Sequence, residues 1–343
     1  METRKVQVTG GSTFTVSIPK DWATEQGISA GSAIELHPEG ESLLLIPQRP
    51  KDGTEGTLDI DTLSGEDLAR AVVTLYVSGF DRIRLETTTI EPEQRRSIRD
   101  ATQSLVGLEV IEETGDYVLL QDLLDSSELS IHNAVTRMRL IALTMLGDAV
   151  ESVTSANHEL ARDVIRRDDD VDRLWFMVSR VFRSVLRDPR AAAALGVSRE
   201  VCFDYHSSAR QLERIADHSV KIATLAIELD GIPDDVGNGL SVLQEEATGI
   251  IEEAMTALLE EDSAEATRLA NHARDAVMEI DDQTRRTDEL IRALEDPTQA
   301  QLLGLIVDSL SRTADYGGNI AETALQKAAP TPGSVADTAE TTA

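Results

Sequence analysis

The chain has 343 residues, of which 41% are hydrophobic and 3% aromatic, and this is enough apolar material for two or three packed domains. Acidic residues outnumber basic ones by 62 to 32, giving a formal net charge of −30, which excludes non-specific nucleic-acid binding over the whole surface. The single cysteine, Cys202, excludes an intrachain disulfide, and the absence of any run of about 18 apolar residues excludes a membrane span.

The location of the protein is predicted from its first residues and its charge. Residues 1–5 lack the apolar region of a signal peptide, which indicates a cytoplasmic protein without membrane insertion. Only five of the 32 basic residues are lysines. An acid-rich surface repels itself in dilute buffer, whereas molar salt shortens the Debye length to about 3 Å and screens the repulsion. The composition therefore resembles that of halophilic archaea, with an acidic mesophilic protein as the alternative.

Residues 4–47 predict a small β-rich module. Apolar residues alternate on both sides of a Gly10-Gly11-Ser12 turn, which indicates two short strands: Val6, Val8, Phe14, Val16 and Ile18. Pro19 opens a helical turn at 20–26, and two further strands are expected at 34–36 and 43–46, around a turn at 39–41. Four short strands and one helical turn enclose too little apolar surface to fold alone, so a partner is expected.

Two segments of this module carry a family resemblance. The first is residues 8–20, ending in Ile18-Pro19-Lys20, and the second is Gly27-Ile28-Ser29-Ala30-Gly31. They resemble the AbrB/MazE/SpoVT swapped-hairpin DNA-binding domain. The resemblance implies a homodimer with interleaved hairpins over residues 1–49. It also implies contact with promoter DNA through basic and polar residues near the first hairpin: Arg4, Lys5, Ser12, Thr13 and Lys20. Basic residues around the second strand are sparse and Asp21 follows Lys20, so a module used only for dimerisation is the alternative.

A linker at 48–56 precedes a predicted small α/β domain at 56–125. Its strands are expected at 57–61, 82–87, 108–112 and 117–121, and its helices at 66–78 and 92–106. The segment has neither a glycine-rich phosphate loop nor a nucleophile elbow. A structural spacer is the favoured interpretation, and a ligand-binding or docking module is the alternative.

The region from 126 to 329 has a helical pattern throughout. Apolar and small residues recur at steps of three and four, as in Leu212, Ile215, Ser219, Ile222, Leu225 and Leu229. Prolines at 189, 233 and 297 divide the region into about six long helices, which are expected to form antiparallel bundles at 126–231 and 234–329. Residues 330–343 are rich in Pro, Thr and Ala and predict a disordered tail.

The helical region contains an internal repeat. Residues 212–223 align with residues 310–321 at an offset of 98, and an acidic helix precedes each copy, at 166–174 and 279–282. The predicted fold is therefore multidomain and mainly α, with a swapped-hairpin β module, a small α/β unit and two tandem antiparallel three-helix bundles.

Two acidic pairs in the first half point to a metal site. Asp168 and Asp172, and likewise Glu213 and Asp217, are four residues apart and share a helix face. Two such helices facing each other would offer four carboxylates to Mg, Ca, Mn or Fe. Chance alone gives about 11 acidic pairs at this spacing in so acidic a chain, so a solvated surface is the alternative. The position of the second pair beside an apolar stripe, inside a repeated motif, favours the site.

Three motifs together resemble PhoU-type phosphate-uptake regulators. They are Leu-Glu-Arg-Ile-Ala-Asp-His at 212–218, Arg-Thr-Ala-Asp-Tyr at 312–316 and the acidic run at 168–172. The resemblance implies two homologous bundles, carboxylate clusters that bind Fe, Mn, Zn or Mg, and negative regulation of phosphate uptake and cellular phosphate homeostasis. Its implied partner is a phosphate-transport ATPase or a signalling protein.

The second half departs from this pattern. Ser311 stands where the first copy has Glu213, and Asp281 and Asp282 have no acidic residue four positions later. A second site built on these two residues and Asp315 is therefore expected to be weaker than the first. His206 and His218 are interpreted as surface or packing residues, and Trp175 and Phe176 as core.

Three functions remain open. The favoured one is a non-enzymatic transcription regulator acting through the AbrB-like module. The second is an adaptor that controls a phosphate transporter through its helical bundle and does not bind DNA. The third is a carboxylate-bridged metal enzyme, which is disfavoured because the sequence has no nucleophile–base constellation and lacks the Glu-x-x-His ligands of such bundles.

Overall fold

The computed structural model describes residues 3–39, 42–48, 53–124 and 130–330, and the chain divides into two compact units, residues 1–53 and 54–343. The first unit contains β1 (Gln7–Thr9), β2 (Thr13–Thr15), α1 (Lys20–Glu25), β3 (Ile34–Glu39) and β4 (Ser42–Pro47). β1 pairs antiparallel with β2, and β3 with β4, which confirms the two predicted hairpins. Residues 40–41 of the predicted turn, residues 49–52 of the predicted linker and the tail from 331 lie outside the described residues.

The first unit has no core of its own. None of its described residues is buried, although Trp22, Leu44, Leu45 and Ile46 are half-buried. Six of its apolar side chains are 52% to 76% exposed: Val6, Val8, Phe14, Val16, Leu36 and Leu43. The β1–β2 turn depends on Gly10 and Gly11, whose φ angles of 66° and 81° lie in the region that favours glycine. The unit is thus a pair of hairpins in which many apolar side chains face water.

The second unit begins with the predicted α/β domain. Its elements are β5 (Glu55–Asp59), α2 (Gly65–Val77), β6 (Arg82–Glu86), α3 (Pro92–Gln103), β7 (Leu108–Glu113) and β8 (Tyr117–Asp122). The sheet order is β5-β6-β8-β7, with β5 and β6 parallel and the other pairs antiparallel. A separate core forms around Leu68, Tyr76 and Ile98. β5 begins at Glu55, so the predicted linker at 48–56 extends two residues too far.

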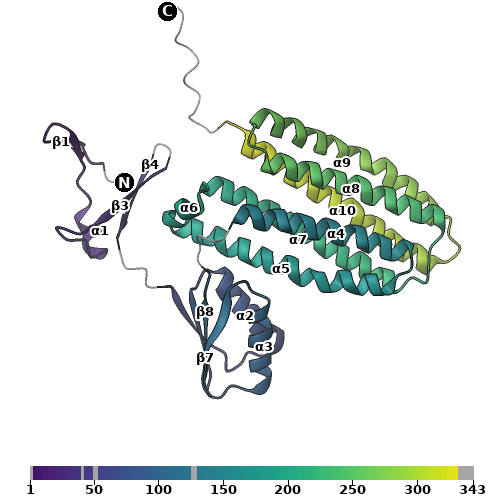
Figure 1. Ribbon diagram of the computed structural model, residues 1–343, viewed down its shortest axis with the longest axis horizontal. Coiled ribbons are helices and arrows are strands. Elements are labelled where there is room, and N and C mark those ends of the chain that lie inside the picture. The colour runs from purple at the N-terminus through teal and green to yellow at the C-terminus, as the bar shows by residue number, and fades with distance from the viewer. Residues whose placement is uncertain (1–2, 40–41, 49–52, 125–129, 331–343) are drawn as a thin grey trace, which may run out of the picture. The chain divides into compact units, whose positions relative to one another are not determined.

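The rest of the second unit is helical. It contains α4 (Ile131–Thr154), α5 (His158–Arg187), α6 (Pro189–Leu195), α7 (Arg199–Ile227), α8 (Asp234–Leu259), α9 (Ser263–Arg292) and α10 (Pro297–Ala328). Figure 1 shows α4, α5 and α7 packed side by side, next to α8, α9 and α10. The six long helices and the two three-helix bundles are confirmed. The short α6 was not predicted, because Pro189 was interpreted only as a break. Pro189 instead occupies the first turn of α6, behind the capping side chain of Asp188.

The two bundles share one hydrophobic core. α7 packs against α10 and α4 against α8, and a single cluster of buried residues runs through all six long helices. Among the described helices, none has a stretch long and apolar enough to cross a membrane.

Candidate functional site

The four acids of the first predicted site come together between α5 and α7. Asp168 and Asp172 lie on α5, and Glu213 and Asp217 on α7. Burial raises the pKa of Asp168 to about 7, with further contributions from the carboxylates of Asp172 and Asp217. These contributions place Asp168 within electrostatic range of Asp172 and Asp217.

The acids share a half-buried environment. Burial raises the pKa of Asp172 to about 6, and the negative charge of Asp217 adds to this effect. Burial, and then the charge of Asp217, raises the pKa of Glu213 to about 7. The surroundings therefore disfavour four simultaneous negative charges at neutral pH. Protonation or a bound cation would relieve that repulsion.

Glu213 is the most buried of the four, with 9% of its surface exposed. Its Oε1 accepts a 2.7 Å hydrogen bond from Nη1 of Arg210. Its Oε2 is buried and has no hydrogen-bond partner among the described residues. A buried carboxylate oxygen without a donor is costly, and a hard cation is one species that would satisfy it.

The residues fit a hard cation in their chemistry, because the donors are all carboxylate oxygens. Their arrangement is not a finished coordination cage. In the described part of the chain, no group of three or more His, Cys, Asp and Glu side chains is placed to hold a metal ion. The geometry thus offers acidic donors on one surface, with Glu213 Oε2 unpartnered beside them.

The second predicted site is only partly assembled. Burial raises the pKa of Asp315 on α10, Arg312 opposes this shift and Asp281 on α9 adds to it, so Asp281 and Asp315 lie within electrostatic range. Asp282 instead forms an exposed ion pair with Arg285 at 3.3 Å. The structure therefore groups two of the three acids, and both are exposed.

The predicted DNA-contacting residues all lie in the first unit and are all exposed. Arg4 and Lys5 precede β1, Ser12 and Thr13 lie at the β1–β2 turn, and Lys20 is the first residue of α1. Their side chains are accessible to a ligand.

A row of arginines on α5 was missed by the sequence analysis. Arg173, Arg180 and Arg187 are seven residues apart and contact the α/β domain. Arg180 is 8% exposed. It forms a 2.6 Å ion pair with Asp122 and donates to the carbonyl oxygen of Tyr76 at 2.7 Å.

The other two arginines also donate to carbonyl groups at helix ends. Arg173 donates to the carbonyl oxygen of Gln103 at 2.7 Å, and Arg187 donates to the carbonyl oxygen of Ser78. The last carbonyl groups of a helix lack intrahelical partners, so arginines there satisfy them and favour the negative end of the helix dipole. The seven-residue spacing of these arginines can be read from the sequence, but the helix ends that they contact cannot.

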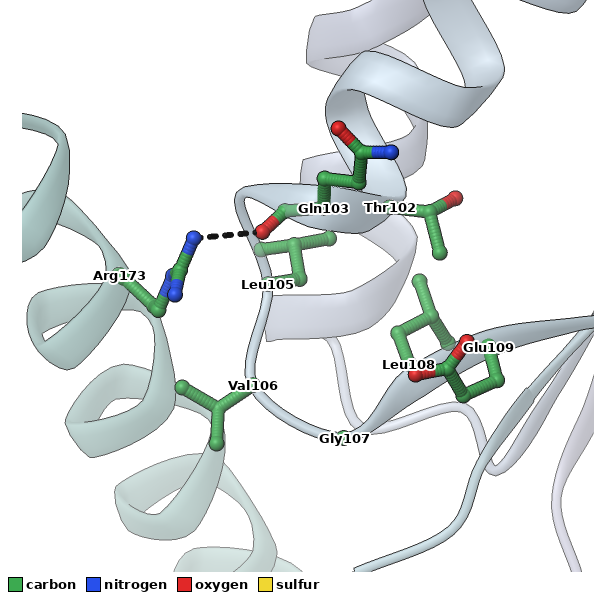
Figure 2. Close-up of a pocket in the computed structure, with 8 residues that line it drawn as sticks. All are labelled: Thr102, Gln103, Leu105, Val106, Gly107, Leu108, Glu109 and Arg173. Carbon is green, nitrogen blue, oxygen red and sulfur yellow. Dashed lines mark hydrogen bonds between the residues drawn. The ribbon is translucent and has the colours of Figure 1, made fainter.

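A pocket of about 490 Å³ opens beside this contact. Figure 2 shows it between the end of α3, the start of β7 and Arg173, whose guanidinium donates to the Gln103 carbonyl. Leu105, Val106 and Leu108 line its apolar side. The pocket is part of the seam between the α/β domain and α5.

Aromatic side chains continue along α5 and α7 from the four acids. The His206 ring stacks on Phe182 with 4.4 Å between centroids, and lies 4.9 Å from the Trp175 ring. Phe203 is 6.0 Å from Phe182. Trp175 and Phe176 were predicted to be core residues, but both are only half-buried. Trp175 packs against the edge of the bundle core, and Phe176 packs against the core of the α/β domain.

The comparisons with known proteins agree with this architecture. Residues 135–226 match the PhoU domain, and residues 7–53 match MazE, the bacterial antitoxin of antidote–toxin recognition. Among curated proteins, none is significantly similar to this chain.

Two solved structures resemble the helical region. The first is the crystal structure of PhoU from Pseudomonas aeruginosa, with 22% sequence identity and a TM-score of 0.50. The match covers 57% of this chain and 93% of that chain. The second is the crystal structure of the phosphate transport system regulatory protein PhoU from Streptococcus pneumoniae, with 19% sequence identity and a TM-score of 0.48. This match covers 57% of this chain and 91% of that chain. The chain thus combines a MazE-like N-terminal region with a mainly helical unit that contains a PhoU-domain match and has the PhoU-like fold.

Proposed function

We propose that the chain is a non-enzymatic negative regulator of phosphate uptake and cellular phosphate homeostasis, acting on transcription through its first unit. The observation that carries this proposal is the pairing of two matches in one chain, the PhoU domain at 135–226 and the MazE-like region at 7–53. A sensor or relay bundle joined to a DNA-binding module is the simplest assignment for that pairing.

The first unit supports a homodimer as the working form. Its exposed apolar side chains, such as Phe14 at 76% and Val8 at 62%, would be buried by a second copy, and apolar burial contributes about 25 cal/mol per Å². The predicted DNA-contacting residues, Arg4, Lys5, Ser12, Thr13 and Lys20, would then occur twice in the assembly. Two copies suit a symmetric DNA site.

The four acids between α5 and α7 support binding of Mg²⁺, Mn²⁺ or iron at Asp168, Asp172, Glu213 and Asp217. The unpartnered Oε2 of Glu213 and the raised pKa values of its neighbours are the reasons for this assignment. Bound cation would remove the repulsion among the carboxylates and stabilise this half of the bundle.

The test is genome-wide chromatin immunoprecipitation of the tagged protein from phosphate-replete and phosphate-starved cells of its host. We expect discrete peaks at promoters of phosphate-transport genes, and occupancy that changes with phosphate. A Lys5→Ala/Lys20→Ala variant should lose those peaks while keeping the same cellular abundance. A flat profile from an intact, functional tagged protein would reject the transcriptional role.

The second candidate is an adaptor on a phosphate transporter, and one observation favours it. The chain carries a net charge of −30, which opposes association with DNA outside a local basic patch. This candidate predicts that the Lys5→Ala/Lys20→Ala variant still controls phosphate uptake. It also predicts that a phosphate-transport ATPase co-purifies with the protein.

A further inference from the structure

The surface shared by α5 and α7 has an apolar end and an acidic end. We name it the α5–α7 strip and define it by Trp175 and Phe182 on α5, Phe203 and His206 on α7, and the four acids. Among the described helices, only α4 packs extensively against both α5 and α7. α10 also packs against α7 but makes no extensive contact with α5, so among the described helices α4 alone bridges the two.

The apolar end is unusually accessible for aromatic side chains. Phe203 is 51% exposed, and Leu186, one turn beyond Phe182, is 53% exposed. Burial lowers the pKa of His206 to about 4, so its ring is neutral where it stacks on Phe182 at 4.4 Å. Exposed aromatic side chains next to stacked, partly buried ones are typical of sites where a partner buries apolar surface.

The acidic end carries four carboxylates, and the described residues provide one ion pair within it, between Arg210 and Glu213. Asp172 is ten residues from Phe182 along α5, and Glu213 is ten residues from Phe203 along α7. At 1.5 Å per helical residue, the two ends are about 15 Å apart. The different chemistry of the two ends suits a ligand that is basic at one end and apolar at the other.

We propose that the α5–α7 strip docks a helix of a partner protein. That helix carries lysine or arginine at one end and a large apolar side chain about three turns away on the same face. The basic end pairs with the half-buried Asp172 and the exposed Asp217, and the apolar side chain packs on Phe203 and His206. This inference rests on the proposed function in one respect, that a regulator acts by contacting another protein. A divalent cation at the acids would compete with the basic end of the helix.

The test uses the full chain with Trp22→Phe, which leaves Trp175 as its single tryptophan, in buffer containing EDTA. Trp175 fluorescence is titrated with a synthetic 16-residue helical peptide that has lysines in its first turn and leucine and phenylalanine in its last. Two further peptides replace the lysines with glutamate or the apolar pair with serine. We expect saturable binding of the first peptide, and affinities at least about fivefold weaker for the other two.

Variants of the protein locate the site. Phe203→Ala and Asp172→Asn should each lower the affinity for the first peptide by at least about fivefold. Leu140→Ala, an equally exposed apolar residue on α4 at 58%, and Glu252→Gln, exposed on α8, should leave the affinity unchanged. Circular dichroism confirms that each variant is folded. No saturable binding of the first peptide, equal binding of all three peptides, or equal binding by Phe203→Ala and Leu140→Ala would overturn the proposal. Chromatin occupancy is independent of these peptides, so its failure is distinguishable from failure of the docking site.

Discussion

His218 on α7 and Tyr316 on α10 meet at the junction of the two bundles, with His218 Nε2 3.4 Å from the Tyr316 hydroxyl oxygen and ring centroids 5.6 Å apart. These residues are 98 positions apart, the same offset as the internal repeat, so equivalent positions of the two halves contact each other. Lys221 lies 3.9 Å from Asp308, and Asn319 donates to Gln211 at 3.3 Å. α7 and α10 therefore run antiparallel around an approximate internal twofold axis.

Gly317, next to Tyr316, allows α10 to approach α8 closely. A Cβ at this position would lie 2.8 Å from Cγ2 of Ile250 and 3.3 Å from the backbone nitrogen of Ile251. We expect Gly317→Ala to reduce the free energy of unfolding by about 1–3 kcal/mol through overpacking. Gly304→Ala on the same helix is the control, because nothing lies within 4 Å of its Cβ, and it should be neutral or raise stability by up to about 1 kcal/mol. Urea denaturation of both variants measures the difference, and equal stability would contradict the close approach.

Arg180 is the central contact between α5 and the α/β domain. Its replacement by methionine would leave the Asp122 carboxylate, whose side chain is 9% exposed, without its cation. We expect a loss of about 3–5 kcal/mol in the free energy of unfolding. Hydrogen exchange should quicken at the C-terminal turn of α2, because the Tyr76 carbonyl loses one of its two donors and keeps only the Gly79 amide. Arg183→Met is the control on an exposed face of α5 and should change both quantities little. Unchanged exchange in Arg180→Met would show that the contact does not hold the domain in place.

The carboxylates between α5 and α7 predict a stability that falls as the pH rises. The pKa values of Asp168 and Glu213 are raised to about 7 in the folded protein, whereas unfolded carboxyl groups titrate near pH 4. Between these values the folded state binds more protons than the unfolded state, so the free energy of unfolding decreases with rising pH. Melting temperatures from pH 5 to pH 8 should show this slope. Asp168→Asn should flatten it, and Asp170→Asn, an exposed neighbour, should not.

A Glu213 variant tests the cation. Adding Mg²⁺ or Mn²⁺ at pH 8 should raise the melting temperature of the unaltered protein, because a ligand that binds only the folded state stabilises it. The rise should be smaller for Glu213→Gln. Equal rises in the two proteins would place cation binding elsewhere on the acidic surface.

The net charge of −30 predicts salt-dependent stability. Raising KCl from about 0.1 M to about 2 M shortens the Debye length from about 10 Å to below about 3 Å and screens repulsion among the acids. We expect a higher melting temperature at high salt. Sodium sulfate must not replace KCl in the titration, since sulfate strengthens apolar burial by itself. A flat response to KCl would favour the acidic mesophilic alternative.

Periodicity explains how much of this molecule was predictable. The period-two and period-three-to-four patterns located the hairpins, the α/β elements and the six long helices, because each pattern reports which face of an element is buried. The convergence of Asp168 and Asp172 with Glu213 and Asp217 followed from two facing helices. Whether three oxygens point at one spot depends on side-chain rotation, which spacing does not determine. The partners of Arg180 were equally hidden, since Tyr76 and Asp122 are distant in sequence.

α5 contacts α7, the end of α3 and the core of the helical bundle. Asp172 faces the carboxylates of α7, while the next residue, Arg173, holds the end of α3, and the valines of the same helix lie in the bundle core. A rotation of α5 about its own axis would therefore shift the acids and the α/β domain together. A ligand at the pocket of Figure 2 and a ligand among the acids would change each other's affinity by the same factor if each bound one rotational state of α5 more tightly. A single 30-residue helix would thus connect the two positions.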